Sequence, residues 1–499
     1  MGNIIYQYDK SDPLSIYEYS DGLIEHTLFE LFGQAAIDAF GNSSNKGELG
    51  QNVEELFFGY KKNSISGPDF QEANLELKCT GVTKYVKTGN WRIKERLVCG
   101  DINYFSVVND TFESSSFYLK CRLMLLLFYL YEKGAKNYDL KFVIRILWQL
   151  PESDLKIIKD DYDKIVKWVK DGKAHELTEG LTTYLAACRG GGASTNDQSQ
   201  PYSTEKAKLR RFSLKPAYMR TVIANLTKEE HYYTNYNKEK VRELFTYEQL
   251  KTSTFDNLVI EQILNFKGLD YVQLCNKLHA TKTNAKQKYA LITNKVVSPR
   301  IPLKDVEEYK KAGFTIKTIR LNTMGQPDEA MSFKNIDYQE VFDNDIWEES
   351  ECYDLFSGRF LFVIFHEVPN ETITYKYFYK KQKCHKFVKN EKKYILADAF
   401  YWVMPQEDLD VAEDYWKDMR KSVIANEIDL QHFWRENPEA DDKFPEAKYF
   451  HVRPKGATGN YKGKAINPHG GNADKYCYWF NHDYVYNIIN QHYNHQDNT

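Results

Sequence analysis

The chain has 499 residues, which is enough for two or three domains of ordinary size. Its formal net charge of −3 excludes a histone-like polycation, although a neutral protein can still carry a local basic cleft for nucleic acid. Aromatic residues make up 15% of the chain, whereas glycine (26) and proline (14) are few, which excludes a disordered or fibrous protein.

The apolar runs and the cysteines indicate the cellular compartment of the protein. The longest uninterrupted apolar run, 123–131, is about half as long as a membrane-spanning helix requires, and the N-terminus lacks a signal-peptide pattern. Eight cysteines without a Cys-x-x-Cys pair are typical of reduced thiols and imply neither a zinc site nor a disulfide framework. We expect a cytoplasmic protein without a membrane partner.

The predicted elements of the first part begin with helices. Apolar residues three or four apart predict helices over Asp21–Phe40 and Lys46–Gly59. Alternation of polar and apolar residues predicts a half-buried strand over Asn74–Cys79. The apolar segments Leu123–Tyr131 and Leu140–Leu150 are typical of strands buried on both faces. This order predicts an α/β or α+β domain with a mixed sheet.

Two polar stretches divide the rest of the chain. The glycine-rich segment Arg189–Ser203 predicts a surface loop. The segment 227–240 has no clear period, so we place the domain boundary there and predict domains over 1–232 and 233–499. A helical connector is expected over about 233–290.

The chain also repeats itself once. Trp148-Gln-Leu-Pro151 returns as Trp402-Val-Met-Pro405, and further pairs follow in the same order. These pairs are Asp154 with Asp408, Leu75–Lys78 with Phe314–Lys317, and Phe212–Tyr218 with Tyr478–Tyr484. The common order predicts two tandem domains of one fold, and the alternative is chance similarity between aromatic-rich segments.

The segment Gly67–Lys78 carries the clearest chemical pattern. On a strand Glu76 and Lys78 share one face, and a turn can bring the Asp69 carboxylate beside Glu76. Two carboxylates suit Mg²⁺, and a neighbouring ammonium can hold an attacking water and face developing negative charge. This set is the minimum for metal-dependent phosphodiester cleavage. The alternative is an edge strand with an ordinary solvated Glu–Lys face.

Several motifs in order resemble MutH, the mismatch-repair nicking endonuclease, and the related type II restriction enzymes that cut at GATC. The motifs are Lys46-Gly-Glu-Leu-Gly-Gln-Asn-Val-Glu54, Pro68-Asp69, Leu75-Glu76-Leu77-Lys78, and Phe112-Glu-Ser-Ser-Ser116 with Lys120. The resemblance covers the first 220 or so residues, and the two-domain form is similar to a staphylococcal member of the family. It implies PD-(D/E)xK nuclease folds with mixed central sheets, Mg²⁺ as cofactor and hydrolysis of double-stranded DNA.

The resemblance also implies roles for individual residues. Asp69 and Glu76 would be the metal ligands, and Lys78 would position or activate the water. Glu54 would be an additional acidic residue on the preceding helix, and Lys120 would face the phosphate or complete the catalytic site. For Glu54 and Lys120 the alternative is an ordinary solvated side chain.

Base-reading elements of the family are an Arg-Pro-Lys loop and a later strand. In the second domain Arg453 and Lys455 match the loop, and Trp479 stands at the strand's tyrosine position.

The first domain departs from this pattern. Cys188 and Gly190 stand where the family has arginine and lysine, so Arg189 is the predicted substitute. Its strand reads Phe212-Ser-Leu-Lys215, with Ser213 at the tyrosine position and Lys215 as the predicted DNA contact.

The second domain lacks the catalytic set, because Thr315 stands where Glu76 stands in the first and no Pro-Asp pair precedes it at the right distance. We therefore expect one cutting domain and one degenerate effector domain. The predicted protein is a type II, effector-dependent (type IIE) restriction endonuclease that binds two GATC sites and is blocked by adenine methylation. A monomer in solution and a dimer on DNA are both compatible with this prediction. The alternatives are a mismatch-repair nickase and a non-catalytic DNA-binding regulator.

Overall fold

The computed structural model describes residues 7–41, 47–60, 67–84, 89, 91–94, 96–132, 134–190, 197–226, 243–369, 375–379, 382–386, 392–428, 449–454 and 464–496. The chain forms two compact units. Unit 1 comprises Met1–Thr254 and Val306–Gly313, and unit 2 comprises Phe255–Asp305 and Phe314–Thr499. The predicted boundary at 232/233 falls in the segment 227–242, outside the described residues.

Unit 1 contains three sheets, with strand orders β2-β1-β4-β5, β3-β9-β6 and β7-β8. Its strands are β1 Glu76–Lys84, β2 Trp91–Ile93, β3 Leu97–Asp101, β4 Leu123–Leu130, β5 Phe142–Gln149, β6 Leu185–Arg189, β7 Asp197–Gln200, β8 Ser203–Lys208 and β9 Arg210–Leu214. Its α-helices are α1 Pro13–Tyr19, α2 Leu28–Phe32, α3 Gln34–Phe40, α4 Gly47–Asn52, α5 Tyr104–Val107, α6 Ser116–Cys121, α7 Glu152–Lys170, α8 Pro216–Leu226, α9 Tyr247–Thr252 and α13 Glu307–Ala312.

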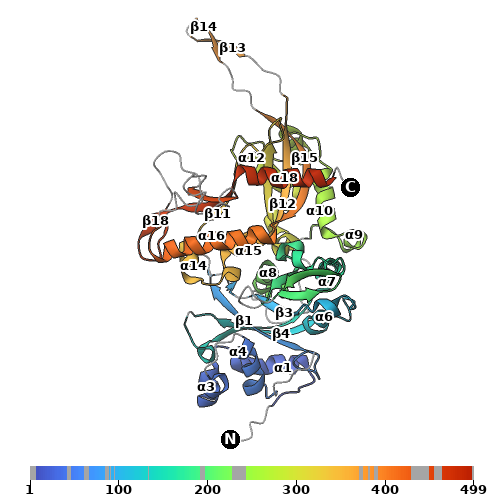
Figure 1. The fold of residues 1–499 in the computed structure, drawn as a ribbon, viewed down its shortest axis with the longest axis vertical. Helices are drawn as coiled ribbons and strands as arrows, with labels where there is room; N and C mark the ends of the chain where they lie inside the picture. Colours follow the sequence, from blue (N-terminus) through green and yellow to red (C-terminus); the bar gives the residue numbers. More distant parts are fainter. Residues whose placement is uncertain are drawn as a thin grey trace. The chain divides into compact units, whose positions relative to one another are not determined.

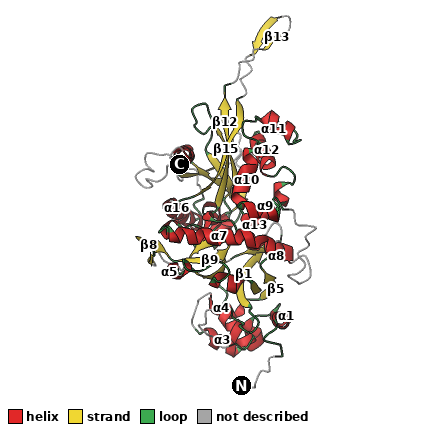
Figure 2. Cartoon of the chain, turned by 90° about the vertical axis from the view of Figure 1, so that its right-hand side faces the viewer, coloured by secondary structure: helices red, strands yellow, loops and turns green. Residues whose placement is uncertain are grey.

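The four-stranded sheet holds the candidate site. β1 runs parallel to β4, with Glu76 opposite Met124, and β4 pairs antiparallel with β5, so the sheet is mixed. Figures 1 and 2 both show this sheet between the N-terminal helices α1, α3 and α4 on one side and α7 on the other. Leu75 and Leu77 lie in the core below it. The predicted mixed sheet and the buried strand β4 are thus confirmed, whereas β5 lies at the edge of the sheet and is only partly buried.

Three sequence-based elements are wrong in detail. The single helix predicted over Asp21–Phe40 is broken, because Thr27 forms a capping box that starts α2 and Gly33 ends it at φ +54°. The strand predicted to end at Cys79 continues to Lys84. The predicted glycine-rich loop Arg189–Ser203 contains β7, and β8, its antiparallel partner, begins at Ser203; residues 191–196 lie outside the described residues.

Unit 2 has a related arrangement of strands. Its sheets have orders β10-β12-β15, β11-β19-β16, β13-β14 and β17-β18. Its strands are β10 Thr315–Leu321, β11 Met331–Asn335, β12 Arg359–Val368, β13 Tyr375–Tyr379, β14 Gln382–Lys386, β15 Lys393–Val403, β16 Phe450–Pro454, β17 Lys464–Ile466, β18 Asn472–Asp474 and β19 Tyr476–Phe480. Its α-helices are α10 Phe255–Leu264, α11 Tyr271–Lys277, α12 Lys288–Val297, α14 Tyr338–Asp343, α15 Glu351–Phe356, α16 Gln406–Ile424 and α18 His482–Gln496.

The long helices α7 and α16 stand in similar surroundings. Each has 19 residues and starts directly after a proline. The Tyr218 hydroxyl donates to Asp154 at 2.8 Å in unit 1, and the Tyr484 hydroxyl donates to Asp408 at 2.6 Å in unit 2. These two pairs are the ones matched by the sequence repeat, so the repeat corresponds to equivalent contacts within each unit.

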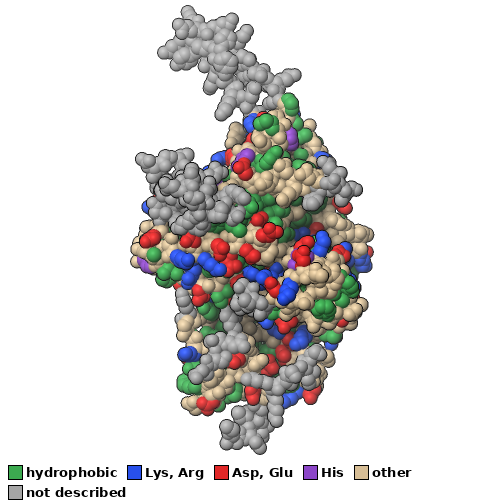
Figure 3. Space-filling view, in the orientation of Figure 1, with side chains coloured by type: hydrophobic (Ala, Val, Ile, Leu, Met, Phe, Trp, Pro, Cys, Tyr) green, Lys and Arg blue, Asp and Glu red, His purple; other side chains and the backbone are tan. Residues whose placement is uncertain are grey.

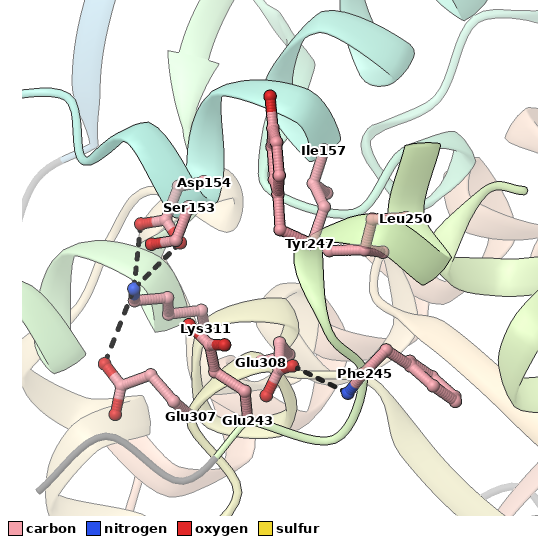
Figure 4. Close-up of a pocket in the computed structure, with 10 residues that line it drawn as sticks. All are labelled: Ser153, Asp154, Ile157, Glu243, Phe245, Tyr247, Leu250, Glu307, Glu308 and Lys311. Carbon is pink, nitrogen blue, oxygen red and sulfur yellow. Dashed lines mark hydrogen bonds and ion pairs between the residues drawn. The ribbon is translucent and has the colours of Figure 1, made fainter. Parts of the chain in front are cut away.

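Asp154 also anchors a segment that is distant in the sequence. The Lys311 ammonium of α13 lies 2.8 and 3.0 Å from the two carboxylate oxygens of Asp154, and 3.5 Å from Glu307 (Figure 4). Both partners of the Asp154–Lys311 ion pair are almost fully buried. A buried ion pair is tolerated because each charge has a partner. Removing one partner leaves the other charge buried and uncompensated, which is strongly destabilising.

Lys311→Met should therefore lower the free energy of unfolding by about 3–5 kcal/mol, since it leaves the Asp154 carboxylate buried without its cation. Chemical denaturation of the variant measures this effect. The matched control is Lys310→Met, because Lys310 is exposed on the same helix and should change stability by no more than about 0.5 kcal/mol. Equal stability of the two variants would show that the ion pair contributes nothing.

Candidate active site

A tight turn brings Asp69 to the start of β1. Phe70 and Leu75 exchange two backbone hydrogen bonds, and Asn74 takes a left-handed conformation with φ +50°. The turn returns the chain so that the Leu77 backbone N–H donates to Asp69 Oδ2 at 2.9 Å. The turn that the sequence predicted between Asp69 and Glu76 is therefore present.

Glu76 is the first residue of β1, and its side chain is only 1% exposed. Its Oε1 accepts a hydrogen bond from the Lys78 ammonium at 2.6 Å. Its Oε2 is buried and has no hydrogen-bond partner among the described residues. An unsatisfied carboxylate oxygen in a buried place is costly, so this atom is suited to accept a ligand.

Two lysines face this carboxylate. Burial lowers the pKa of Lys78, but Glu76, Cys121 and Asp69 together raise it by more, so the pKa of Lys78 is raised overall and the ammonium stays charged. The Lys120 ammonium lies 3.8 Å from Glu76 Oε1. Lys120 is on the last turn of α6, and Ser115 caps this short helix by accepting from the Tyr118 N–H at 3.1 Å. The Phe112–Ser116 motif thus positions Lys120.

Glu54 lies on a rare backbone element. Its segment Val53–Phe57 is a π-helix, in which the Phe58 N–H donates to the Val53 carbonyl at 3.2 Å. Such wide turns are frequent at functional sites. Burial, followed by the carboxylates of Asp69 and Glu76, raises the pKa of Glu54 to about 7. The apolar periodicity predicts a regular helix over this segment, and the structure has a π-helix instead.

The donor set fits a divalent cation that retains water. Burial and the Glu76 carboxylate raise the pKa of Asp69, so the two acids repel each other without a cation. In the described part of the chain, no three His, Cys, Asp or Glu side chains form a ready-made metal cage. Mg²⁺ requires none, because it binds through one or two carboxylates and keeps several waters.

The two predicted DNA contacts of unit 1, Arg189 and Lys215, differ in exposure. Arg189 ends β6 and is partly exposed. Lys215 is only 8% exposed, and its ammonium donates to the Thr182 carbonyl beside the buried Asp161 carboxylate. The prediction that Lys215 contacts DNA is therefore corrected, because its ammonium is buried and hydrogen-bonded inside unit 1.

Unit 2 has a parallel strand pair like β1–β4, and its first strand begins with a threonine in place of a carboxylate. Thr315 begins β10, opposite Phe360 of the parallel strand β12, as Glu76 begins β1. The Lys317 ammonium donates to the Ser332 carbonyl at 2.5 Å and lies over the Phe333 ring.

The only nearby Pro-Asp pair in the sequence, Pro327-Asp328, is used elsewhere. Asp328 accepts from Lys392 at 3.0 Å and from the Tyr394 hydroxyl, so its carboxylate is already engaged.

The predicted base-reading residues of unit 2 stack on one another. The Arg453 guanidinium lies 3.7 Å from the centre of the Trp479 ring, and His451 stacks on that ring at 5.8 Å. All three side chains are partly exposed. Lys455 lies outside the described residues.

A pocket in unit 1 offers a second cluster of charged groups (Figure 4). It is lined by Ser153, Asp154, Ile157, Glu243, Phe245, Tyr247, Leu250, Glu307, Glu308 and Lys311. Carboxylates outnumber the lysine, so this pocket is unsuited to a phosphate. On the face seen in Figure 3, basic and acidic side chains of unit 1 are interspersed, so any DNA contact there rests on local groups.

The raised pKa of Glu54 predicts a pH effect on stability in metal-free protein. A carboxyl group with a raised folded-state pKa contributes stability that is present below pH 4.5 and is lost as the pH rises through about 7. Glu54→Gln stays neutral, so its melting temperature should exceed that of the wild type increasingly between pH 5 and 8. The control is Glu55→Gln, since Glu55 is exposed on the same segment. A pH-independent difference between Glu54→Gln and the wild type would contradict the raised pKa.

Comparisons with known proteins agree with this geometry. The family model of MutH, described as a DNA mismatch repair enzyme, matches residues 58–161, the segment that contains the turn, β1, α6, β4 and β5. The type II restriction enzyme Sau3AI of Staphylococcus aureus is 29% identical over 472 residues, which are 89% of this chain and 88% of the relative. The chain is thus similar to MutH over the segment that holds the candidate site, and to a type II restriction enzyme over most of its length.

Proposed function

We propose that this protein is a restriction endonuclease that hydrolyses phosphodiester bonds of double-stranded DNA with Mg²⁺, at GATC. The observation that carries the proposal is the buried, unpartnered Oε2 of Glu76 beside Asp69, faced by Lys78 and Lys120. The similarity to a restriction enzyme extends over both units, which favours restriction over a mismatch-repair nickase. The GATC sequence and a cytoplasmic location rest on the family resemblance.

In the proposed mechanism Asp69 and Glu76 would hold the metal. Mg²⁺ bound there would polarise the scissile phosphate and lower the pKa of a bound water. Lys78 stays protonated, so its role is to orient the attacking water and to face the negative charge that develops on the phosphate. Lys120 supplies a second positive charge on the same side. Glu54, with its pKa near neutrality, is suited to accept a proton from the water.

The proposal divides the work between two copies of one nuclease fold. Support comes from the corresponding orders β1-β4-β5 and β10-β12-β15, and from the equivalent Tyr–Asp contacts on α7 and α16. Unit 2 would bind DNA through Arg453, Lys455 and Trp479 without cutting it, because Thr315 and Lys317 offer no carboxylate. A second recognition site bound there would act as an effector.

Glu76→Gln should reduce cleavage of unmethylated duplex DNA in Mg²⁺ by about 100-fold or more, because it removes a charge that holds the metal. Digestion of plasmid and sequencing of the ends measures both the rate and the site. The matched control is Glu72→Gln, an exposed acid in the same turn, which should cut like the wild type. Full activity of Glu76→Gln would sink the catalytic assignment, and ends mapped away from GATC would sink the specificity alone.

A substrate with two recognition sites should be cut faster than a substrate with one. Allosteric coupling is typically about 1–3 kcal/mol, so we expect a roughly 5–150-fold difference. Arg453→Ala should remove the difference while leaving slow cleavage of the one-site substrate. The control is Lys464→Ala, an exposed lysine of unit 2. Equal rates on both substrates in the wild type would show that unit 2 is not an effector.

A further inference from the structure

The three-stranded sheets of the two units can be compared residue by residue. In unit 1 the pair β6–β9 has Leu185 opposite Leu214 and Cys188 opposite Arg211. In unit 2 the pair β16–β19 has Phe450 opposite Phe480 and Arg453 opposite Cys477. Counted from these first pairs, the two ladders are in the same register. An arginine and a cysteine are therefore paired at the same position of the strand pair in both units. In unit 1 the arginine is on the second strand, β9, and in unit 2 it is on the first strand, β16.

The exchange keeps the guanidinium on the same face of the sheet. Residues directly opposite each other on antiparallel strands point to one face, with Cβ atoms about 4.5–5.5 Å apart. The Arg211 side chain then passes over Gly190, since a Cβ added at Gly190 would lie 3.2 Å from Arg211 Cγ and Nε. Any larger side chain at Gly190 would compete with Arg211 for this space. In the sequence of unit 2 the place of Gly190 is taken by Lys455.

The surroundings of Arg211 leave its charge accessible. Its side chain is 38% exposed, and its Nε lies 2.7 Å from Asp101, which is 67% exposed. An ion pair this open to water contributes little to stability and exchanges readily for another acceptor. The neighbouring Arg210 differs, because it is buried and donates to the Ala187 carbonyl at 3.3 Å. Arg189 lies opposite Arg210, on the other face of the strand pair.

Arg211 is also within reach of DNA held at the candidate active site. Leu214, three residues along β9, contacts the Cys99 thiol, which lies beside Cys121, the residue that follows Lys120. Three residues of strand span about 10 Å. Four base pairs of duplex span about 14 Å. Arg211 thus lies about three strand residues from a contact chain that leads to the helix of Lys120, so we expect one recognition site to reach both.

We propose that Arg211 is the base-reading arginine of unit 1 and contacts a guanine edge in the recognition site. It takes the role for which the sequence pattern suggested Arg189. The inference rests on the proposed function and adds a specificity residue to it. A guanidinium fork matches the paired acceptors of guanine in the major groove, whereas a contact to phosphate would carry no sequence information.

The test measures cleavage and binding by Arg211→Ala in the full-length protein. Loss of a bidentate base contact should lower kcat/KM on duplex that contains the site by roughly 5–150-fold. In a Glu76→Gln background, affinity for that duplex should fall while affinity for a duplex without the site changes little. Asp101→Asn removes the ion pair but keeps the guanidinium, so it should cleave like the wild type. Thermal unfolding checks that every variant is folded, and Arg211→Gln is the alternative if the alanine variant is not.

Because the arginine and the cysteine occupy opposite strands in the two units, swapping them in unit 1 is a rescue experiment. The double variant Cys188→Arg, Arg211→Cys places the guanidinium where unit 2 has it and should recover at least part of the lost rate. Equal losses in Asp101→Asn and Arg211→Ala would reduce Arg211 to a structural partner of Asp101. Equal loss of affinity for both duplexes would indicate a phosphate contact and overturn the base contact. Wild-type behaviour of Arg211→Ala would overturn the inference and leave the nuclease function intact, whereas a wild-type protein that cuts no duplex would overturn both.

Discussion

The candidate site depends on a carboxylate held at the first residue of a buried parallel strand. Glu76 is fixed by the pairing of β1 with β4 and by Leu75 and Leu77, which anchor the strand in the core. Its burial is unfavourable unless cations surround it, and Lys78 and Lys120 supply that charge. The two lysines face Glu76. Burial and the Glu76 carboxylate raise the pKa of Asp69, and burial followed by the Asp69 and Glu76 carboxylates raises the pKa of Glu54. The cluster is thus poised to take up a divalent cation.

Unit 2 shows what the same scaffold does without this constraint. At the equivalent strand start Thr315 has no charge to balance, and Lys317 turns to a backbone carbonyl and an aromatic ring. The second three-stranded sheet instead presents a stack of arginine, tryptophan and histidine. Under the proposed function, the cutting unit and the recognition unit would differ in a few side chains on similar strand arrangements.

Much of the site could be predicted from the sequence because its signals are local. The alternation around Glu76 fixed the face that Lys78 shares with it, and the spacing to Asp69 allowed the turn that the structure contains. The helix over 21–40 was mispredicted because Thr27 and Gly33 interrupt an apolar periodicity that looks continuous. The π-helix at Glu54 was not predicted, because an apolar periodicity of three or four residues does not distinguish it from a regular helix. Lys215 was misjudged because the Thr182 carbonyl that accepts from its ammonium is distant in the sequence.

The most direct test of the account is the binding of Mn²⁺, as a spectroscopic substitute for Mg²⁺, to the full-length protein without DNA. Paramagnetic titration of the wild type should show binding that competes with Mg²⁺. Glu76→Gln should lose it, and Thr315→Ala should retain it, because unit 2 contributes no carboxylate at the equivalent strand start. Unchanged binding in Glu76→Gln would contradict the central claim that the carboxylates at the start of β1 form the metal site.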